Sequence, residues 1–201
     1  ANTHTPVLFF STQGLVYKIK AHKIPEGTSV SKGKSIFNIL PLKSHHAISS
    51  IMPLPEDETE WKKLMIIFAT SKGNVRKNTL EDFVNINNSG KIAMKLDQDD
   101  RIIGVKICRD DQDILLSTHY GKCIRFKSKK LRLFKGRSSK GIKGRQLNDN
   151  DKLISLSILE NTNIDIKAIN KDKKVKSGID KFILSVTENG YGKRSSYSDY
   201  R

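Results

Sequence analysis

The chain has 201 residues, with 37 Lys and Arg against 21 Asp and Glu and a formal net charge of +16. An excess of this size attracts polyanions, which means nucleic acid or an anionic membrane surface. The membrane alternative is disfavoured because no apolar run approaches the roughly 20 residues of a spanning helix. Residues 1–6 lack the features of a signal peptide, and the two isolated cysteines, Cys108 and Cys123, fit reduced thiols. We therefore expect a cytoplasmic protein.

Four segments of the chain share one pattern, in which a short apolar strand ends in a hydroxyl residue and a glycine follows three residues later. A tight hairpin turn needs positive φ, which glycine adopts without penalty. The hydroxyl suits a strand end, where it can bond to nearby backbone. The hydroxyls are Ser11, Thr70, Thr118 and Thr187, and the hairpin glycines are Gly14, Gly73, Gly121 and Gly190.

Three of these units continue in parallel. A second glycine beside lysine follows about 17 to 20 residues later, then a leucine that closes a strand-like stretch such as 36–40, and then a last apolar strand. The second glycines are Gly33, Gly90 and Gly141, the leucines are Leu40, Leu96 and Leu147, and the last strands are expected at 48–52, 102–107 and 153–159. Helical periodicity is almost absent, so strands and turns explain the chain better.

The hairpin glycines lie 59, 48 and 69 residues apart, which is blade-sized for a propeller. We expect repeat units at about 6–54, 62–108, 112–160 and 181–201, with insertions at 55–61 and 161–180. Propellers close with roughly four to eight blades. The chain is therefore expected to form one all-β, propeller-like domain over residues 1–201, with three full blades and part of a fourth, as part of a larger disc.

A basic residue stands four positions after every hairpin glycine. Because a core position would not be basic four times out of four, we expect one outward face that carries charge and contacts DNA phosphates. These matched cations are Lys18, Lys77, Arg125 and Arg194. The other candidate DNA-binding residues are Lys20, Lys32, Lys34, Arg76, Lys91, Lys127, Arg137, Lys140, Lys143, Arg145 and Lys193. Lysines of the run 171–176 are expected to matter less, because an irregular insertion loses entropy on binding.

Long phrases of the chain resemble the C-terminal domain of the bacterial DNA gyrase A subunit. They include residues 1–4, 14–17, 39–42, 90–96, 100–105, 141–147 and 187–194, and the resemblance covers nearly the whole chain except 55–61 and 161–180. It implies a six-bladed β-pinwheel whose neighbouring blades exchange a strand. It also implies a basic rim that wraps duplex DNA and supports negative supercoiling. The implied partners are the rest of the gyrase A polypeptide and the gyrase B polypeptide, in a heterotetramer.

The same resemblance leaves two points open. The family's signature heptapeptide, Gln-Arg-Arg-Gly-Gly-Lys-Gly, is absent and would be expected just before Ala1. It is thus open whether this chain alone wraps DNA, and whether the parent is gyrase or the related topoisomerase IV subunit. The nucleophilic tyrosine of these ATP-dependent type II topoisomerases belongs to an N-terminal domain, so we expect this chain to be non-catalytic. None of Tyr17, Tyr120, Tyr191, Tyr197 and Tyr200 is expected to have that role.

Other sites find little support in the sequence. The glycine-rich stretch 27–35 has five residues between its glycines where a P-loop needs four, and after 136–141, which has the right spacing, Ile142 stands in place of the lysine. His45 and His46 lack a third ligand nearby in sequence and fit a solvated turn. We expect no metal or cofactor. The alternative of another class is a protein-interaction propeller whose charge serves solubility or an acidic partner.

Overall fold

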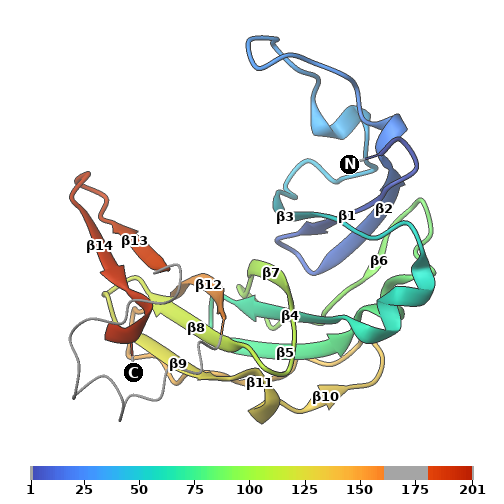
Figure 1. Ribbon diagram of the computed structural model, residues 1–201. Coiled ribbons are helices and arrows are strands. Elements are labelled where there is room, and N and C mark those ends of the chain that lie inside the picture. The colour runs from blue at the N-terminus through green and yellow to red at the C-terminus, as the bar shows by residue number, and fades with distance from the viewer. Residues whose placement is uncertain (1, 161–180, 201) are drawn as a thin grey trace, which may run out of the picture.

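The computed structural model describes residues 2–160 and 181–200, which form a curved row of four β-sheets (Figure 1). Within these residues there are fourteen strands and six short 3-10 helices, so the all-β, propeller-like prediction is confirmed. None of the helices in these two ranges is long and apolar enough to cross a membrane. The run 171–176 lies outside the described residues.

Each sheet is one blade, named here in chain order. Blade 1 contains β1 (Pro6–Ser11), β2 (Leu15–Lys20) and β3 (Ile48–Pro53). Blade 2 contains β4 (Met65–Thr70), β5 (Asn74–Thr79) and β7 (Ile102–Cys108). Blade 3 contains β8 (Asp113–Thr118), β9 (Cys123–Lys127) and β12 (Leu153–Leu159), and blade 4 contains β13 (Phe182–Val186) and β14 (Gly192–Ser196). The expected last strands of the three full units are thus β3, β7 and β12.

The turn after the second strand of each blade is a 3-10 helix. These turns are η1 (Ala21–Lys23), η4 (Leu80–Phe83), η5 (Ser128–Lys130) and η6 (Tyr197–Asp199). Two more lie elsewhere, η2 (Ile36–Asn38) and η3 (Glu58–Lys63). The strand-like stretch expected at 36–40 is therefore wrong, because Ile36–Asn38 form a helical turn that the Ser35 side chain caps through the amide of Phe37.

The hairpin turns form as the glycine and hydroxyl pattern predicts. Gly14 and Gly73 have φ of 84° and 83°, and their amides donate to the carbonyls of Ser11 and Thr70 at 3.2 and 2.9 Å. The hydroxyls of Ser11 and Thr70 also accept from the amides four residues on, at 3.1 and 3.2 Å. Each turn is therefore closed by hydrogen bonds between residues three or four positions apart. Because these bonds are local, the sequence pattern could predict the turns.

Neighbouring blades exchange a short strand. β6 (Lys91–Ile92) of the second unit pairs with β2 of blade 1, and β11 (Ile142–Lys143) of the third unit pairs with β5 of blade 2. Beyond each pairing, two amides of the exchanged chain bond the carbonyl of the preceding hairpin glycine. Ala93 and Met94 donate to Gly14, and Gly144 and Arg145 donate to Gly73, at 2.7 to 3.2 Å. The second glycines thus begin exchange segments, residues 90–96 and 141–147.

The hydrophobic core lies between blades rather than inside one thick domain. Leu8 and Phe10 of β1 pack against Ile66 and Phe68 of β4, and the rings of Phe10 and Phe68 meet edge to face at 5.5 Å. The opposite side of β4 packs against blade 3, through a second cluster that includes Ile67, Ala69, Ile114 and Leu116. Blade 2 is consequently buried on both faces, and this stacking explains how 36% hydrophobic residues suffice.

Candidate nucleic-acid interface

The matched cation of blade 2 does not face solvent. Lys77 in β5 is 3% exposed, and its Nζ bonds the carboxylate of Asp110 and the carbonyl of Ser128, both at 2.9 Å. Ser128 belongs to η5 of blade 3. The ammonium therefore joins two blades, and the predicted outward orientation is wrong at this position.

Two other matched cations make the same kind of contact. Lys18 pairs with Glu58 at 2.7 Å and donates to the carbonyl of Val84, which follows η4 of blade 2. Arg125 pairs with Asp113 and donates to the carbonyls of Tyr197 and Tyr200 in and after η6 of blade 4, at 2.9 and 3.0 Å. Three matched cations thus hold the helical turn of the following blade. We call this contact the inter-blade clamp.

The fourth matched cation, Arg194, is exposed as expected, and its guanidinium lies 4.5 Å from the centre of the Phe182 ring. The prediction failed for the others because alternation along a strand shows only that Lys18, Lys77 and Arg125 share a face. In a stacked blade that face meets the next blade. A buried cation is tolerated there because a carboxylate and a carbonyl replace its water.

Arg76 is also buried rather than available to a ligand. It is fully enclosed, and its guanidinium bonds the side chain of Asn78 and the carbonyls of Ala93, Arg137 and Ser139. Burial lowers the pKa of Arg76 from 12.5 to about 10. Arg76 therefore joins blade 2 to Ala93 of one exchange segment and to the residues just before the other, so it does not face solvent as a candidate DNA contact would.

The remaining candidate residues are spread along the blades and loops. Lys140 pairs with Asp97, and Lys143 donates to the carbonyl of Lys72 at 3.0 Å. Lys91 is half-buried and donates to the carbonyl of Asn85. Arg137 and Arg145 are half-buried, whereas Lys20, Lys32, Lys34, Lys127 and Lys193 are exposed.

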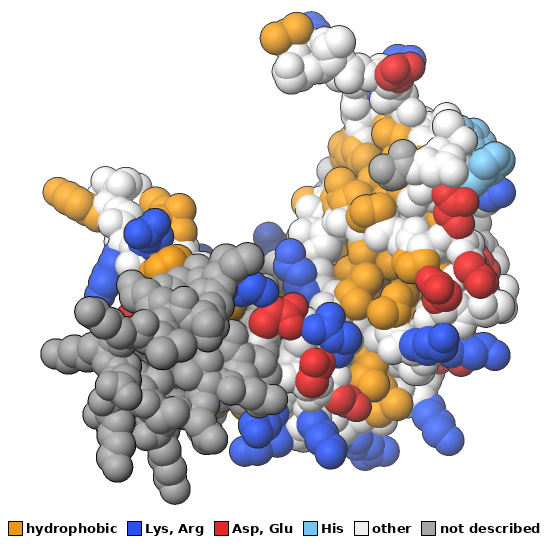
Figure 2. Space-filling model, in the orientation of Figure 1, with side chains coloured by type: hydrophobic (Ala, Val, Ile, Leu, Met, Phe, Trp, Pro, Cys, Tyr) orange, Lys and Arg blue, Asp and Glu red, His pale blue; other side chains and the backbone are white. Residues whose placement is uncertain are grey.

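One strongly basic surface was not recognised as a unit in the sequence. Nine Lys and Arg and no Asp or Glu occur from residue 127 to residue 145, which we call the rim segment. Its short strands β10 (Leu133–Phe134) and β11 both pair with β5 and so form the outer edge of blade 2. Figure 2 shows Lys and Arg side chains gathered along this lower edge of the molecule. The members that the repeat register missed are Lys129, Lys130, Arg132 and Lys135, all exposed.

Charge at this outer edge changes from unit to unit. In the third unit η5 carries the exposed Lys129 and Lys130, whereas the same turn in the second unit, η4, carries Glu81 and Asp82. Asp82 bonds Asn78 at 2.7 Å, while Glu81 is exposed beside Lys62 at 3.4 Å. The positive potential is therefore concentrated on the rim segment rather than repeated evenly around the arc.

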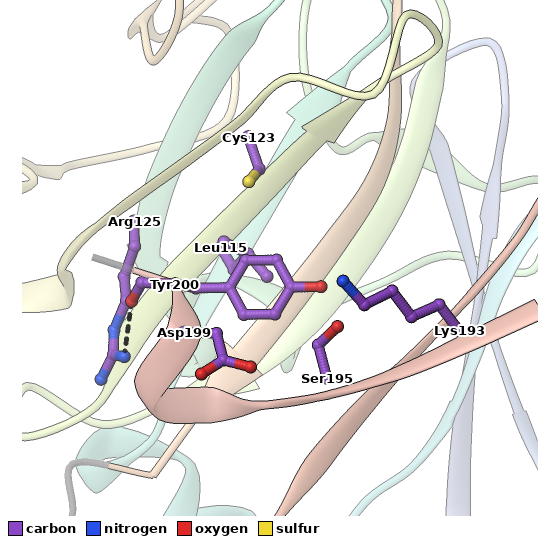
Figure 3. Close-up of a pocket in the computed structure, with 7 residues that line it drawn as sticks. All are labelled: Leu115, Cys123, Arg125, Lys193, Ser195, Asp199 and Tyr200. Carbon is purple, nitrogen blue, oxygen red and sulfur yellow. Dashed lines mark hydrogen bonds between the residues drawn. The ribbon is translucent and has the colours of Figure 1, made fainter.

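A cavity of about 550 Å³ lies between blades 3 and 4 (Figure 3). Arg125 bonds the Tyr200 carbonyl on one side of it, and the amine of Lys193 extends toward the Tyr200 ring from the other. The remaining walls are Leu115, Cys123, Ser195 and Asp199. No set of three His, Cys, Asp or Glu in residues 2–160 and 181–200 is arranged to hold a metal ion.

Comparison with known proteins identifies the fold. The chain is 42% identical to the DNA gyrase A protein of Rickettsia bellii and 35% identical to that of Staphylococcus aureus, over its full length in both cases. It spans 25% and 20% of those proteins, respectively.

Two solved structures share the architecture. A DNA gyrase A C-terminal domain matches with a TM-score of 0.71 at 24% identity, over all of this chain and 57% of that one. The C-terminal domain of a DNA topoisomerase IV matches with a TM-score of 0.79 at 21% identity, over all of this chain and 56% of that one. At these identities the structures establish the fold alone. The family profile described as DNA gyrase C-terminal domain, beta-propeller, matches residues 5–55, 64–109, 112–160 and 181–201, so the chain belongs to that family.

Proposed function

We propose that this chain binds duplex DNA along the outer edge of its blades and serves as the DNA-wrapping part of a DNA gyrase A protein. The observation that carries the proposal is the rim segment, a run of nine cations without a carboxylate on a convex β-sheet edge. Phosphate neutralisation needs cations spaced along a surface, and a curved edge lets successive cations follow a bent duplex.

The contacts with DNA are assigned to exposed cations rather than to the inter-blade clamps. Lys127, Lys129, Lys130, Arg132 and Lys135 are exposed, and all belong to one continuous stretch of the rim segment. Lys77 and Arg76 are fully engaged inside the array, so moving them to phosphate would break the contacts between blades. Lys20, Lys32 and Lys34 of the first unit and Lys193 and Arg194 of blade 4 are also exposed, and they remain candidate DNA contacts outside the rim segment.

The role in a larger enzyme follows from the family. The relatives are DNA gyrase A proteins, which favours gyrase over topoisomerase IV as the parent. In such an assembly this part is non-catalytic and supports negative supercoiling in the cytoplasm, together with the remainder of the gyrase A polypeptide and with the gyrase B polypeptide.

The test is a titration of the chain with a duplex of mixed sequence at several salt concentrations. With on the order of six phosphate contacts, log affinity should fall against log salt with a slope near about −5. A double variant, Lys129→Gln with Lys130→Gln, should weaken binding and reduce the slope by about 2. The matched control is Lys106→Gln with Lys152→Gln, because both lysines are exposed but lie on or beside the opposite strands, β7 and β12.

Three results would contradict the proposal. A flat salt response, or equal losses in the rim and control variants, would show that the rim segment is not the contact surface. Failure to bind a duplex while an acidic protein binds would favour the interaction-propeller alternative.

A further inference from the structure

Two side chains of β5, Arg76 and Asn78, hold the loop that joins β10 to β11. We call this loop, residues 135–141 of the rim segment, the rim loop. Its flanking strands lie beside β5 at the lower edge of the molecule (Figure 1). Asn78 donates two hydrogen bonds to backbone carbonyls here and Arg76 donates two more, at 2.7 to 3.0 Å. The four acceptors in chain order are the carbonyls of Phe134, Gly136, Arg137 and Ser139.

These two side chains, which we call the rim support, are themselves fixed in position. Both are fully buried, and Nε of Arg76 donates to Oδ1 of Asn78 at 2.7 Å. Asn78 also donates to the carboxylate of Asp82 at 2.7 Å, and Arg76 donates to the carbonyl of Ala93. Burial lowers the pKa of Arg76 only to about 10, so the guanidinium stays charged at neutral pH. Hydrogen bonds from a charged donor are stronger than those between neutral groups, so the rim loop is held firmly.

The same positions in the neighbouring blades carry a different kind of residue. Arg76 and Asn78 stand three and five residues after the hairpin glycine of blade 2. The residues at these positions in blades 1 and 3 are apolar or aromatic, namely Tyr17, Ile19, Ile124 and Phe126. Stacking of blades is thus compatible with apolar residues here, so the buried polar pair of blade 2 needs a separate explanation.

The rim loop also differs from its counterpart in the second unit. A Cβ added at Gly141 would lie 3.0 Å from the Cβ of Arg76, and a Cβ added at Gly90 would lie 2.5 Å from the ring of Tyr17. The rim loop therefore corresponds to residues 84–90. That counterpart contains no Lys or Arg, whereas the rim loop contains three. The buried polar pair thus accompanies the basic loop.

The composition of the rim loop works against a single conformation. Two glycines and two serines among its seven residues leave the backbone many alternatives, and its three cations repel one another. A loop with that freedom would lose it when its cations meet phosphates, which weakens binding. Hydrogen bonds to four carbonyls order the backbone beforehand, so this entropy is not lost on binding.

We propose that Arg76 and Asn78 are positioning residues for DNA binding, which order the rim loop so that its cations are presented to the phosphates. This inference rests on the proposed function. Neither residue contacts the duplex, and both act through the backbone of the loop. Of the loop cations, Lys135 is exposed and has no carboxylate partner in the part of the chain that the structure describes, so it is the cation on which the test depends.

The first measurement needs no DNA. Trypsin cleaves after Lys and Arg, so limited digestion of the folded chain reports how often an exposed segment opens. Asn78→Leu keeps a similar side-chain volume but removes both bonds from Asn78 to the backbone at the rim loop. Cleavage after Lys135 should become at least ~10-fold faster relative to cleavage after Lys129 in η5, since two lost hydrogen bonds amount to about that factor.

Ile114→Val is the matched control for a loss of stability elsewhere. Ile114 is fully buried in the core cluster shared by blades 2 and 3, to which no residue of the rim loop belongs. A smaller side chain there lowers the stability of the whole fold, which affects both cleavage sites alike. The ratio of the two cleavage rates should therefore stay unchanged.

The second measurement is a double-mutant cycle on duplex binding, followed by fluorescence anisotropy. In the wild-type background, Lys135→Gln should weaken binding roughly fivefold to tenfold near ~0.1 M salt, the loss of about one phosphate contact. In the Asn78→Leu background the same substitution should weaken binding by less than about twofold, because a loop without fixed backbone contributes little. Lys129→Gln lies in η5, outside the rim loop, and should have the same effect in both backgrounds.

The outcomes separate this inference from the proposed function. Equal effects of Lys135→Gln in the two backgrounds would show a purely structural role and overturn the inference, as would unchanged cleavage after Lys135 in Asn78→Leu. Asn78→Asp replaces the leucine variant if that variant does not fold, because it keeps the acceptor for Arg76 and lacks the two donors. A wild-type chain that binds no duplex would refute the proposed function and this inference together, whereas binding without coupling between the two positions would refute this inference alone.

Discussion

The ammonium of Lys77 in blade 2 donates a 2.9 Å hydrogen bond to the carbonyl oxygen of Ser128 in blade 3. The same ammonium pairs with Asp110, whose side chain is 49% exposed. Lys18 and Arg125 make equivalent contacts at the other two junctions. A positive charge that looks like a DNA contact in the sequence is therefore a structural link between neighbouring blades.

Replacing Lys77 with methionine should destabilise the fold by about 1–3 kcal/mol, because the buried Ser128 carbonyl and the Asp110 carboxylate lose their common donor. The measurement is urea unfolding followed by circular dichroism. Lys106→Met on β7 removes an exposed charge and should change stability by less than about 0.5 kcal/mol. A Lys77→Met protein of unchanged stability that binds DNA weakly would show that Lys77 faces outward and contacts DNA.

The features that the sequence predicted well are local ones. The turn at Gly73 is fixed by residues three and four positions apart, and the last strands β7 and β12 begin just after polar turns. The fold class follows from the repeat of such turns. The strand exchange is not local, and it was predicted only from the resemblance to the family, not from the repeat pattern.

The orientation of the cations could not be read from the sequence. Alternation assigns Lys77 to one face of β5, but only the stacking of blade 3 on that face decides that it is buried. The carboxylate that compensates this burial, Asp110, lies in a loop outside the hairpin. In contrast, the rim segment has a signal in the sequence, namely a long run of cations without an acidic residue. Positions counted from the glycines of each repeat do not reveal this run.

The ion pair between Lys140 and Asp97 should shape the acid stability of the protein. The hydrogen bond from Lys140 lowers the pKa of Asp97 below its ordinary value of 3.8. A carboxyl with a lowered folded pKa contributes stability above its unfolded value, and this contribution is lost as the pH falls through the folded value. The Asp97→Asn protein should therefore lose less free energy of unfolding than the wild type when the pH falls below about 4.

The measurement is urea unfolding of the wild-type and Asp97→Asn proteins at several pH values. Asp99→Asn serves as the control, since Asp99 is exposed in the same turn and has no ion pair among the described residues. A larger loss of unfolding free energy at low pH in Asp97→Asn than in the wild type would contradict this prediction.

Alanine substitutions at Gly141 and Gly121 should distinguish the cost of backbone strain from the cost of a steric clash. Both have positive φ, 80° and 76°, so alanine is strained at either position. At Gly141 the added Cβ would also lie 2.3 Å from the Val75 carbonyl oxygen, whereas at Gly121 it would meet nothing within 4 Å. Gly141→Ala should cost more stability than Gly121→Ala, by at least about 1 kcal/mol. Equal losses in thermal unfolding would mean that the exchange segment does not pack against β5 as described.

The rim offers a test in which DNA affinity should increase. Glu81 stands in η4 at the position that Lys129 occupies in η5, and it is exposed. Its ion pair with Lys62 is exposed on both sides, so breaking it should cost little stability. Glu81→Lys places a cation where the second unit interrupts the basic edge. If the duplex follows that edge, the variant gains about one phosphate contact, which means a salt slope steeper by about 0.9 and roughly fivefold to tenfold tighter binding near ~0.1 M salt.

Asp149→Lys makes the same change in net charge in the exposed turn before β12, on the opposite edge of blade 3. Fluorescence anisotropy of a labelled duplex at several salt concentrations compares the two. A gain confined to Glu81→Lys places the DNA on the outer edge, and equal gains would show that only total charge counts.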